Sequence, residues 1–165
     1  MRVPHGQGSV VLLNAREYPA HPGVRPVYEQ ALEQLSDQAL ARQPVRVICG
    51  DDVQYTVFEQ PDGSHHLYVL AVDWFRAPEA LRNATLILGG HQHPFTLPFG
   101  VMLKIVAQGQ LAAWADSEEA DVLKLSDEGI TVQGTGKATI RMIHDGRAIQ
   151  KVVDFAQAPV QEIGW

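Results

Sequence analysis

The sequence lacks several features that would assign it to a class at once. A single cysteine, Cys49, among 165 residues excludes an internal disulfide, and the apolar run before it favours a buried thiol. No stretch of about 18 apolar residues is present, and no basic-then-apolar leader opens the chain. We therefore expect neither a membrane span nor a signal peptide, and we favour a soluble, cytoplasmic protein.

Positive charge is also scarce. The chain has 13 Lys and Arg residues against 19 Asp and Glu residues, which gives a formal net charge of -6. The basic residues do not cluster beyond isolated pairs, whereas a surface that follows nucleic-acid phosphates needs a contiguous basic patch. A nucleic-acid partner is therefore not expected.

Complete catalytic signatures are missing. No nucleophile-elbow pattern G-x-S-x-G occurs, and Gly134-Thr135-Gly136-Lys137 lacks the spacing of a phosphate-binding P-loop. Two groups of carboxylates, Asp51-Asp52 and the segment 116–121, assign neither a general acid nor a general base. The second group lacks the glycine and the alternating oxygen ligands of a calcium loop. We expect a chain that is not catalytic alone and that needs no cofactor.

The beginning of the chain has the pattern of a strand, a loop and a helix. Residues 9–14 form a short apolar run, and turn-forming prolines and a glycine follow it. Over 26–42, apolar residues recur every three or four positions opposite an acidic side, which predicts an amphipathic helix. Pro26 suits the first helical turn, and Pro44 follows the last one. We assign 1–44 to a strand-loop-helix unit, either the end of an α/β domain or a helix packed on a sheet.

From Val45 onward the apolar residues alternate with polar ones, and turn residues separate strand-length segments. The clearest element is a hairpin in which 53–60 and 65–74 are joined through Pro61-Asp62-Gly63-Ser64. Further strands are expected over 85–88, 95–98, 101–108, 111–115, 122–126, 130–132, 137–144 and 148–155. The series predicts a mainly β protein in which 45–165 form an antiparallel β-sandwich.

The stretch LILGGHQHPFTLPFG contains two histidines that raise the question of a metal site. On a strand, His91 and His93 would point to one face about 7 Å apart, a spacing that metal sites use. No acidic ligand follows the pair, and Gly89-Gly90 and Pro94 favour a tight connection between two strands. We therefore expect no metal here.

Exposed aromatic side chains are the remaining candidates for ligand contact, since sugars present apolar C–H faces that stack on aromatic rings. Trp74 and Phe75 end an expected strand, Trp114 precedes the acidic segment, and Tyr18 lies in the proline-rich loop. Successive strand residues point to opposite faces, so one of Trp74 and Phe75 should be partly exposed or cover an end of the sandwich. A core or lid role is the more ordinary interpretation of these residues, and a carbohydrate platform is the functional one.

The hairpin sequence DVQYTVFEQPDGSHHLYVLAVDW follows a strand and a helix and precedes a long all-β tail. This order resembles the C-terminal part of large bacterial glycoside hydrolases of the β-galactosidase-like kind. In those enzymes a barrel carries the chemistry, an α/β domain follows, and a small β-domain closes the chain. The resemblance implies that 8–42 is the last strand-helix unit of such a middle domain and that 45–165 is the terminal β-domain. It implies no catalytic residue in this chain.

Three functional hypotheses follow. The first is a non-catalytic accessory or assembly β-domain of a carbohydrate-active enzyme, which packs against the rest of a larger enzyme or forms a homo-oligomer, and contacts glycan through the aromatic residues named above. The second is a small cupin-like metal-binding β-barrel, with His91 and His93 completed by His144 or His66. The third is a self-associating structural β protein, because the apolar helix stripe or an open sheet edge needs a cover.

Overall fold

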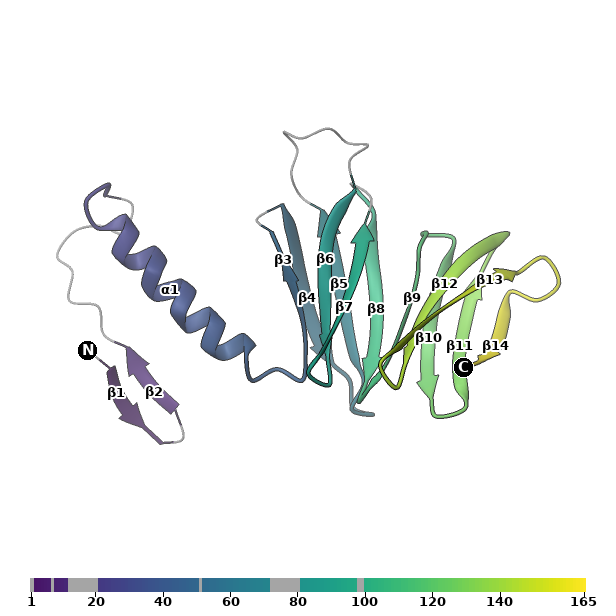
Figure 1. The fold of residues 1–165 in the computed structure, drawn as a ribbon, viewed down its shortest axis with the longest axis horizontal. Coiled ribbons are helices and arrows are strands. Elements are labelled where there is room, and N and C mark those ends of the chain that lie inside the picture. Colours follow the sequence, from purple (N-terminus) through teal and green to yellow (C-terminus); the bar gives the residue numbers. More distant parts are fainter. Residues whose placement is uncertain (1, 7, 12–20, 51, 72–80, 98–99) are drawn as a thin grey trace. The chain divides into compact units, whose positions relative to one another are not determined.

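The computed structural model of the chain describes residues 2–6, 8–11, 21–50, 52–71, 81–97 and 100–165. It divides into two compact units, Met1–Gln43 and Pro44–Trp165. Over the described residues the protein is mainly β, with antiparallel sheets and one helix, which confirms the expected fold class (Figure 1). No helix in these ranges is long and apolar enough to cross a membrane.

The first unit contains a hairpin and the helix. Strands β1 (Arg2–His5) and β2 (Gly8–Val11) pair antiparallel, so a strand that the sequence pattern did not predict precedes the expected one. Helix α1 (Arg25–Leu40) carries Pro26 in its first turn, where the missing N–H costs no helical hydrogen bond. None of the residues of α1 is buried within this unit. Its apolar stripe is exposed at Val27, Leu32 and Leu35.

The second unit is built from three antiparallel sheets. Its strands are β3 (Val45–Cys49), β4 (Val53–Glu59), β5 (His65–Ala71), β6 (Arg82–Leu88), β7 (His91–Leu97), β8 (Met102–Gln108), β9 (Leu111–Ala115), β10 (Ala120–Ser126), β11 (Gly129–Gly134), β12 (Lys137–His144), β13 (Arg147–Asp154) and β14 (Val160–Gly164). The strand orders are β3-β6-β7, β13-β12-β9-β8-β5-β4 and β10-β11-β14.

The expected hairpin is present as β4 and β5, in a register that pairs Val53 with Ala71 and Glu59 with His65. Its turn forms for a local reason: the Asp62 carboxylate accepts hydrogen bonds from the Ser64 backbone N–H at 2.9 Å and from its hydroxyl at 2.7 Å. The expected residues 72–74 of the second strand lie outside the described residues.

The six-stranded sheet is shared by two hydrophobic cores on its opposite faces. Alternation along β9 shows this directly, because Ala112 and Trp114 belong to the first core and Ala113 and Ala115 to the second. The first core is closed by β3, β6 and β7, and the second by β10 and β11. The sandwich is therefore double, with one long sheet between two short ones (Figure 1).

An ion pair helps to hold the second short sheet in place. Lys104 on β8 donates from Nζ to Asp121 Oδ2 at 2.8 Å and to the Val122 carbonyl oxygen at 3.1 Å, both on β10. Asp121 belongs to the acidic segment of the sequence, so this carboxylate serves a structural contact between strands.

Candidate functional site

A groove opens where the first short sheet stops covering the long one. Strand β7 is the last strand of β3-β6-β7, while β12 and β13 end the six-stranded sheet. A cavity of about 280 Å³ lies between them. It is lined by residues of β7, β9, β12 and β13 that include His93, Pro94, Trp114, Arg141, Ile143 and Gln150. We call this cavity the β7–β12 groove.

Trp114 forms the inner wall of the β7–β12 groove. Its side chain is 4% exposed and packs against Phe95 of β7, with the ring centroids 5.9 Å apart and the planes tilted by 58°. Its indole Nε1 is buried and has no hydrogen-bond partner among the described residues. Buried tryptophan N–H groups usually have a partner, and an unpaired one costs about 1–3 kcal/mol. Trp114 is thus a buried wall of the groove and no open sugar platform, and its unpaired N–H is out of reach of solvent.

Arg141 adds further hydrogen-bond donors beside this wall. Antiparallel pairing of β9 with β12 sets Arg141 directly opposite Trp114, so both point to the same face of the sheet. The guanidinium Nε donates to both oxygens of Asp116, at 2.8 and 2.7 Å. Its terminal nitrogens make no hydrogen bond with any described residue, and the side chain is 45% exposed. The ion pair orients the guanidinium and leaves its terminal N–H groups available.

His93 closes the groove from the side of β7. It is 9% exposed, and burial lowers its pKa below the usual 6.5, with the nearby charge of His91 lowering it further. The imidazole is therefore neutral near pH 7, with one nitrogen that donates and one that accepts.

Acidification should destabilise the protein through His93. Below about pH 6.5 the unfolded chain binds a proton at His93, whereas the folded chain binds that proton only at a lower pH. The stability that the protein has above pH 6.5 is therefore lost as the pH falls through the pKa of His93 in the folded state. His66, whose pKa is also lowered mainly by burial, acts in the same direction. We expect the urea midpoint to fall between pH 7 and pH 5.5, and to fall less in His93→Gln.

Urea titrations at both pH values and constant ionic strength measure this effect. His66→Gln is the matched control and should remove a separate part of the same dependence. An unchanged pH dependence in His93→Gln would contradict the assignment of His93 as a buried neutral histidine.

The expectation that His91 and His93 lie in the connection between two strands is wrong, because both residues belong to β7. The turn itself is Gly89-Gly90, with φ of +56° and +83°, and register pairs Leu88 with His91 across it. Strand β7 begins at His91, so His91 and His93 do share one face of a strand. Pro94 is tolerated because β7 is an edge strand, where a missing N–H breaks no ladder.

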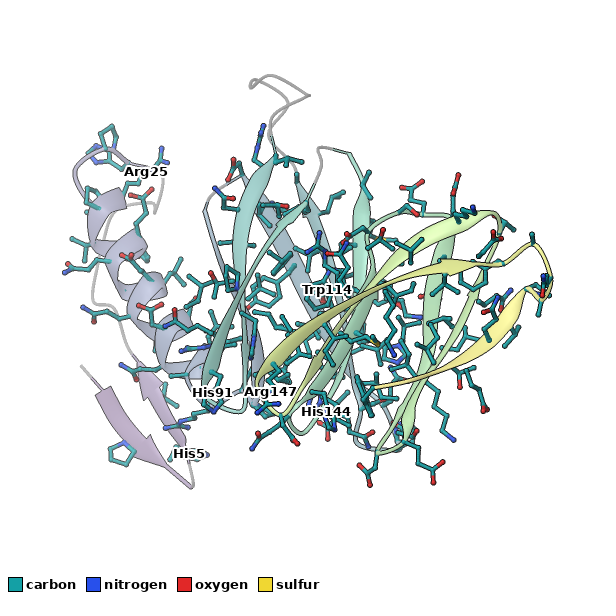
Figure 2. The ribbon with its side chains drawn as sticks, turned by 45° about the vertical axis from the view of Figure 1, so that its right-hand side comes forward. His5, Arg25, His91, Trp114, His144 and Arg147 are labelled. Atoms are coloured by element: carbon teal, nitrogen blue, oxygen red, sulfur yellow. The ribbon has the colours of Figure 1, made fainter. Side chains whose placement is uncertain are left out.

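Other histidines named as metal ligands lie elsewhere. His66 pairs with Val106, whose side chain belongs to the second core, so it points away from the face that carries Trp114. His144 stacks on Trp165, with centroids 5.0 Å apart. Figure 2 shows His91 and His144 near strand ends, whereas Trp114 lies in the interior of the sandwich. Across the described part of the chain, no three His, Cys, Asp or Glu side chains gather as a metal site would require.

The remaining candidates from the sequence are placed as follows. Trp74, Phe75 and Tyr18 lie outside the described residues. Asp52 pairs with the buried Arg82 at 2.9 Å. Arg141 was not anticipated, since an isolated arginine in an alternating strand has the pattern of an ordinary surface residue.

No protein-family model, no curated protein and no solved structure matches this chain.

Proposed function

We propose that the chain is a non-catalytic accessory β-domain of a carbohydrate-active enzyme, and that it binds a sugar residue in the β7–β12 groove. The lining of the groove carries this proposal, because it brings Trp114, Arg141 and Gln150 together around one small cavity. The resemblance of the hairpin and β tail to terminal domains of β-galactosidase-like enzymes supports the same class.

The size and lining of the groove support a small, oxygen-rich ligand. Its volume of about 280 Å³ lies just below the 300–1,000 Å³ that is usual for ligand pockets, so it suits a small ligand. Pro94 and Ile143 provide apolar surface, while Gln150 and His93 provide groups that both donate and accept hydrogen bonds. A single sugar ring needs this mixture of surfaces.

The chemistry of the lining supports binding without catalysis. Glycoside hydrolysis generally needs two carboxyl groups on either side of the scissile bond. None of the described residues that line the groove is a carboxylate, and Asp116, beside Arg141, accepts hydrogen bonds from that arginine at both of its oxygens. One carboxylate held in this way supplies no acid and base pair.

Binding should weaken when the Gln150 amide is removed. In Gln150→Ala, loss of one neutral hydrogen bond should cost about 0.5–1.5 kcal/mol, or up to roughly tenfold in Kd. Calorimetry with a panel of mono- and oligosaccharides measures the change. Gln108→Ala is the control, because Gln108 donates to the Asp62 carbonyl oxygen and does not line the groove. Silence across the panel would remove the glycan contact and leave only an assembly role.

A second candidate function, self-association through a second copy of this chain, is favoured by one surface. The second core contains no residue of β4 or β5 among those described, and large apolar side chains on that face of the long sheet are exposed. Phe58 and Met102 are 53% and 55% exposed there, and Phe58 meets Tyr68 edge-on at 5.9 Å. Strand β4 also ends the sheet, so its outer backbone edge can pair with the same edge of another copy.

Light scattering after size exclusion tests this second candidate. We expect a concentration-dependent dimer that Phe58→Ser shifts to monomer, because the substitution removes an exposed aromatic ring from the contact. Val152→Ser alters an apolar residue of β13 that is 69% exposed, and should leave the dimer intact. A wild-type monomer at all concentrations would exclude self-association.

A further inference from the structure

We infer that the β7–β12 groove recognises a carboxylate, so that its ligand is an acidic sugar. This inference rests on the proposed function and narrows it to uronic acids. Arg141 lines the groove, and its terminal nitrogens make no hydrogen bond with a described residue.

The terminal nitrogens of Arg141 are donors only. A guanidinium has no acceptor, whereas a sugar hydroxyl both donates and accepts. A carboxylate is acceptor-only and offers about four lone-pair sites on two oxygens. The guanidinium of Arg141 therefore matches a carboxylate better than a neutral hydroxyl.

The ion pair with Asp116 holds the Arg141 side chain in place for a ligand. Because Nε is bonded to both oxygens of Asp116, the guanidinium is held in one orientation, and its terminal nitrogens make no hydrogen bond with that carboxylate. A second carboxylate can then bind end-on through two parallel hydrogen bonds, the arrangement that arginine favours. Asp116 is partly exposed, so solvent screens its repulsion of a bound acid.

The rest of the groove suits the ring of the sugar. Gln150 is paired with Arg141 in the β12–β13 register and faces the same side, where its amide can bind a hydroxyl. Pro94, Ile143 and Ala148 supply apolar wall for the C–H face. A carboxylate at one end, a hydroxyl-binding amide beside it and an apolar wall describe a uronic acid.

Calorimetry on the full chain tests this inference with four kinds of probe. These are galacturonic and glucuronic acid, their methyl esters, the neutral sugars galactose and glucose, and the non-sugar carboxylate malate. We expect at least one acid to bind about tenfold or more tighter than its ester and its neutral sugar. Arg141→Gln should abolish that preference, and Arg141→Lys should retain only part of it, because lysine cannot form the paired bonds.

Arg147→Gln is the matched control on the same hairpin. Arg147 pairs with His144 across the turn, and Figure 2 shows the two residues close together. The register sets Arg147 on the face opposite Arg141, so Arg147 should not affect the preference for an acid. The three indole N–H signals of the chain give an independent readout by NMR. The acid should shift the one signal that disappears in Trp114→Phe.

The outcomes separate this inference from the function on which it rests. Equal affinity for acids, esters and neutral sugars, unaffected by Arg141→Gln, would overturn the carboxylate assignment while sugar binding stands. Malate bound as tightly as the uronic acids would overturn the assignment to a sugar. Failure of every probe to bind would overturn both the inference and the glycan contact.

Discussion

Replacing Gly129 with alanine is expected to detach β14 from the second short sheet. Gly129 begins β11 and is paired with Gly164 of β14. A Cβ at this position would overlap the Ile163 carbonyl oxygen and lie 2.9 Å from the Gly164 Cα. These are backbone atoms of a hydrogen-bonded ladder, so they cannot yield as the end of a side chain can. We expect a loss of at least about 1–3 kcal/mol of stability, the usual cost of overpacking.

Tryptophan fluorescence and thermal unfolding together measure this effect. Trp165 follows β14, donates to the Ser126 carbonyl oxygen at 3.0 Å and packs on the second core, so detachment should expose it and shift its emission to the red. Gly164→Ala is the matched control in the same residue pair. Its Cβ would meet only the Glu128 carbonyl oxygen, at 3.8 Å, and it should change stability by less than about 0.5 kcal/mol. Equal losses in both variants would contradict the steric argument.

Local patterns in the sequence were sufficient to predict much of the fold. The turn at 61–64 was foreseeable because Asp62 and Gly63 have turn chemistry that acts within four residues, and alternation gave most strands of the long sheet. Strand β14 was missed. It is partly exposed throughout, so its residues show no strong apolar alternation, and its pairing with β11 is a long-range choice.

The candidate site was less predictable than the fold. The chemistry of aromatic residues alone points to Trp114, but its burial depends on the contact with Phe95 of β7. Arg141 is a candidate binding residue only because Asp116 holds its side chain beside a groove that two separate sheets form. The neighbours of His93 in the sequence predict a turn, because the edge position of β7, which admits Pro94, is not encoded locally. Such sites depend on contacts between distant segments.

The shared long sheet predicts that the two cores unfold together. Ile105 on β8 belongs to the first core and Ile140 on β12 to the second, and both side chains are fully buried. Each Ile→Ala substitution should cost about 2–5 kcal/mol, because it removes buried methyl groups and leaves a cavity. Since the backbone of the long sheet belongs to both cores, neither core can be lost without breaking ladder bonds that the other needs.

Hydrogen exchange with mass spectrometry distinguishes the possible results peptide by peptide. We expect Ile105→Ala and Ile140→Ala each to accelerate exchange across both cores, with one unfolding transition in urea. Val152→Ala, at a position that is 69% exposed on β13, is the control and should change stability by less than about 0.5 kcal/mol. If Ile140→Ala instead accelerated exchange only in β10, β11 and β14, the second short sheet would be a separate unfolding unit. The long sheet would then unfold together with the first core, independently of the second short sheet.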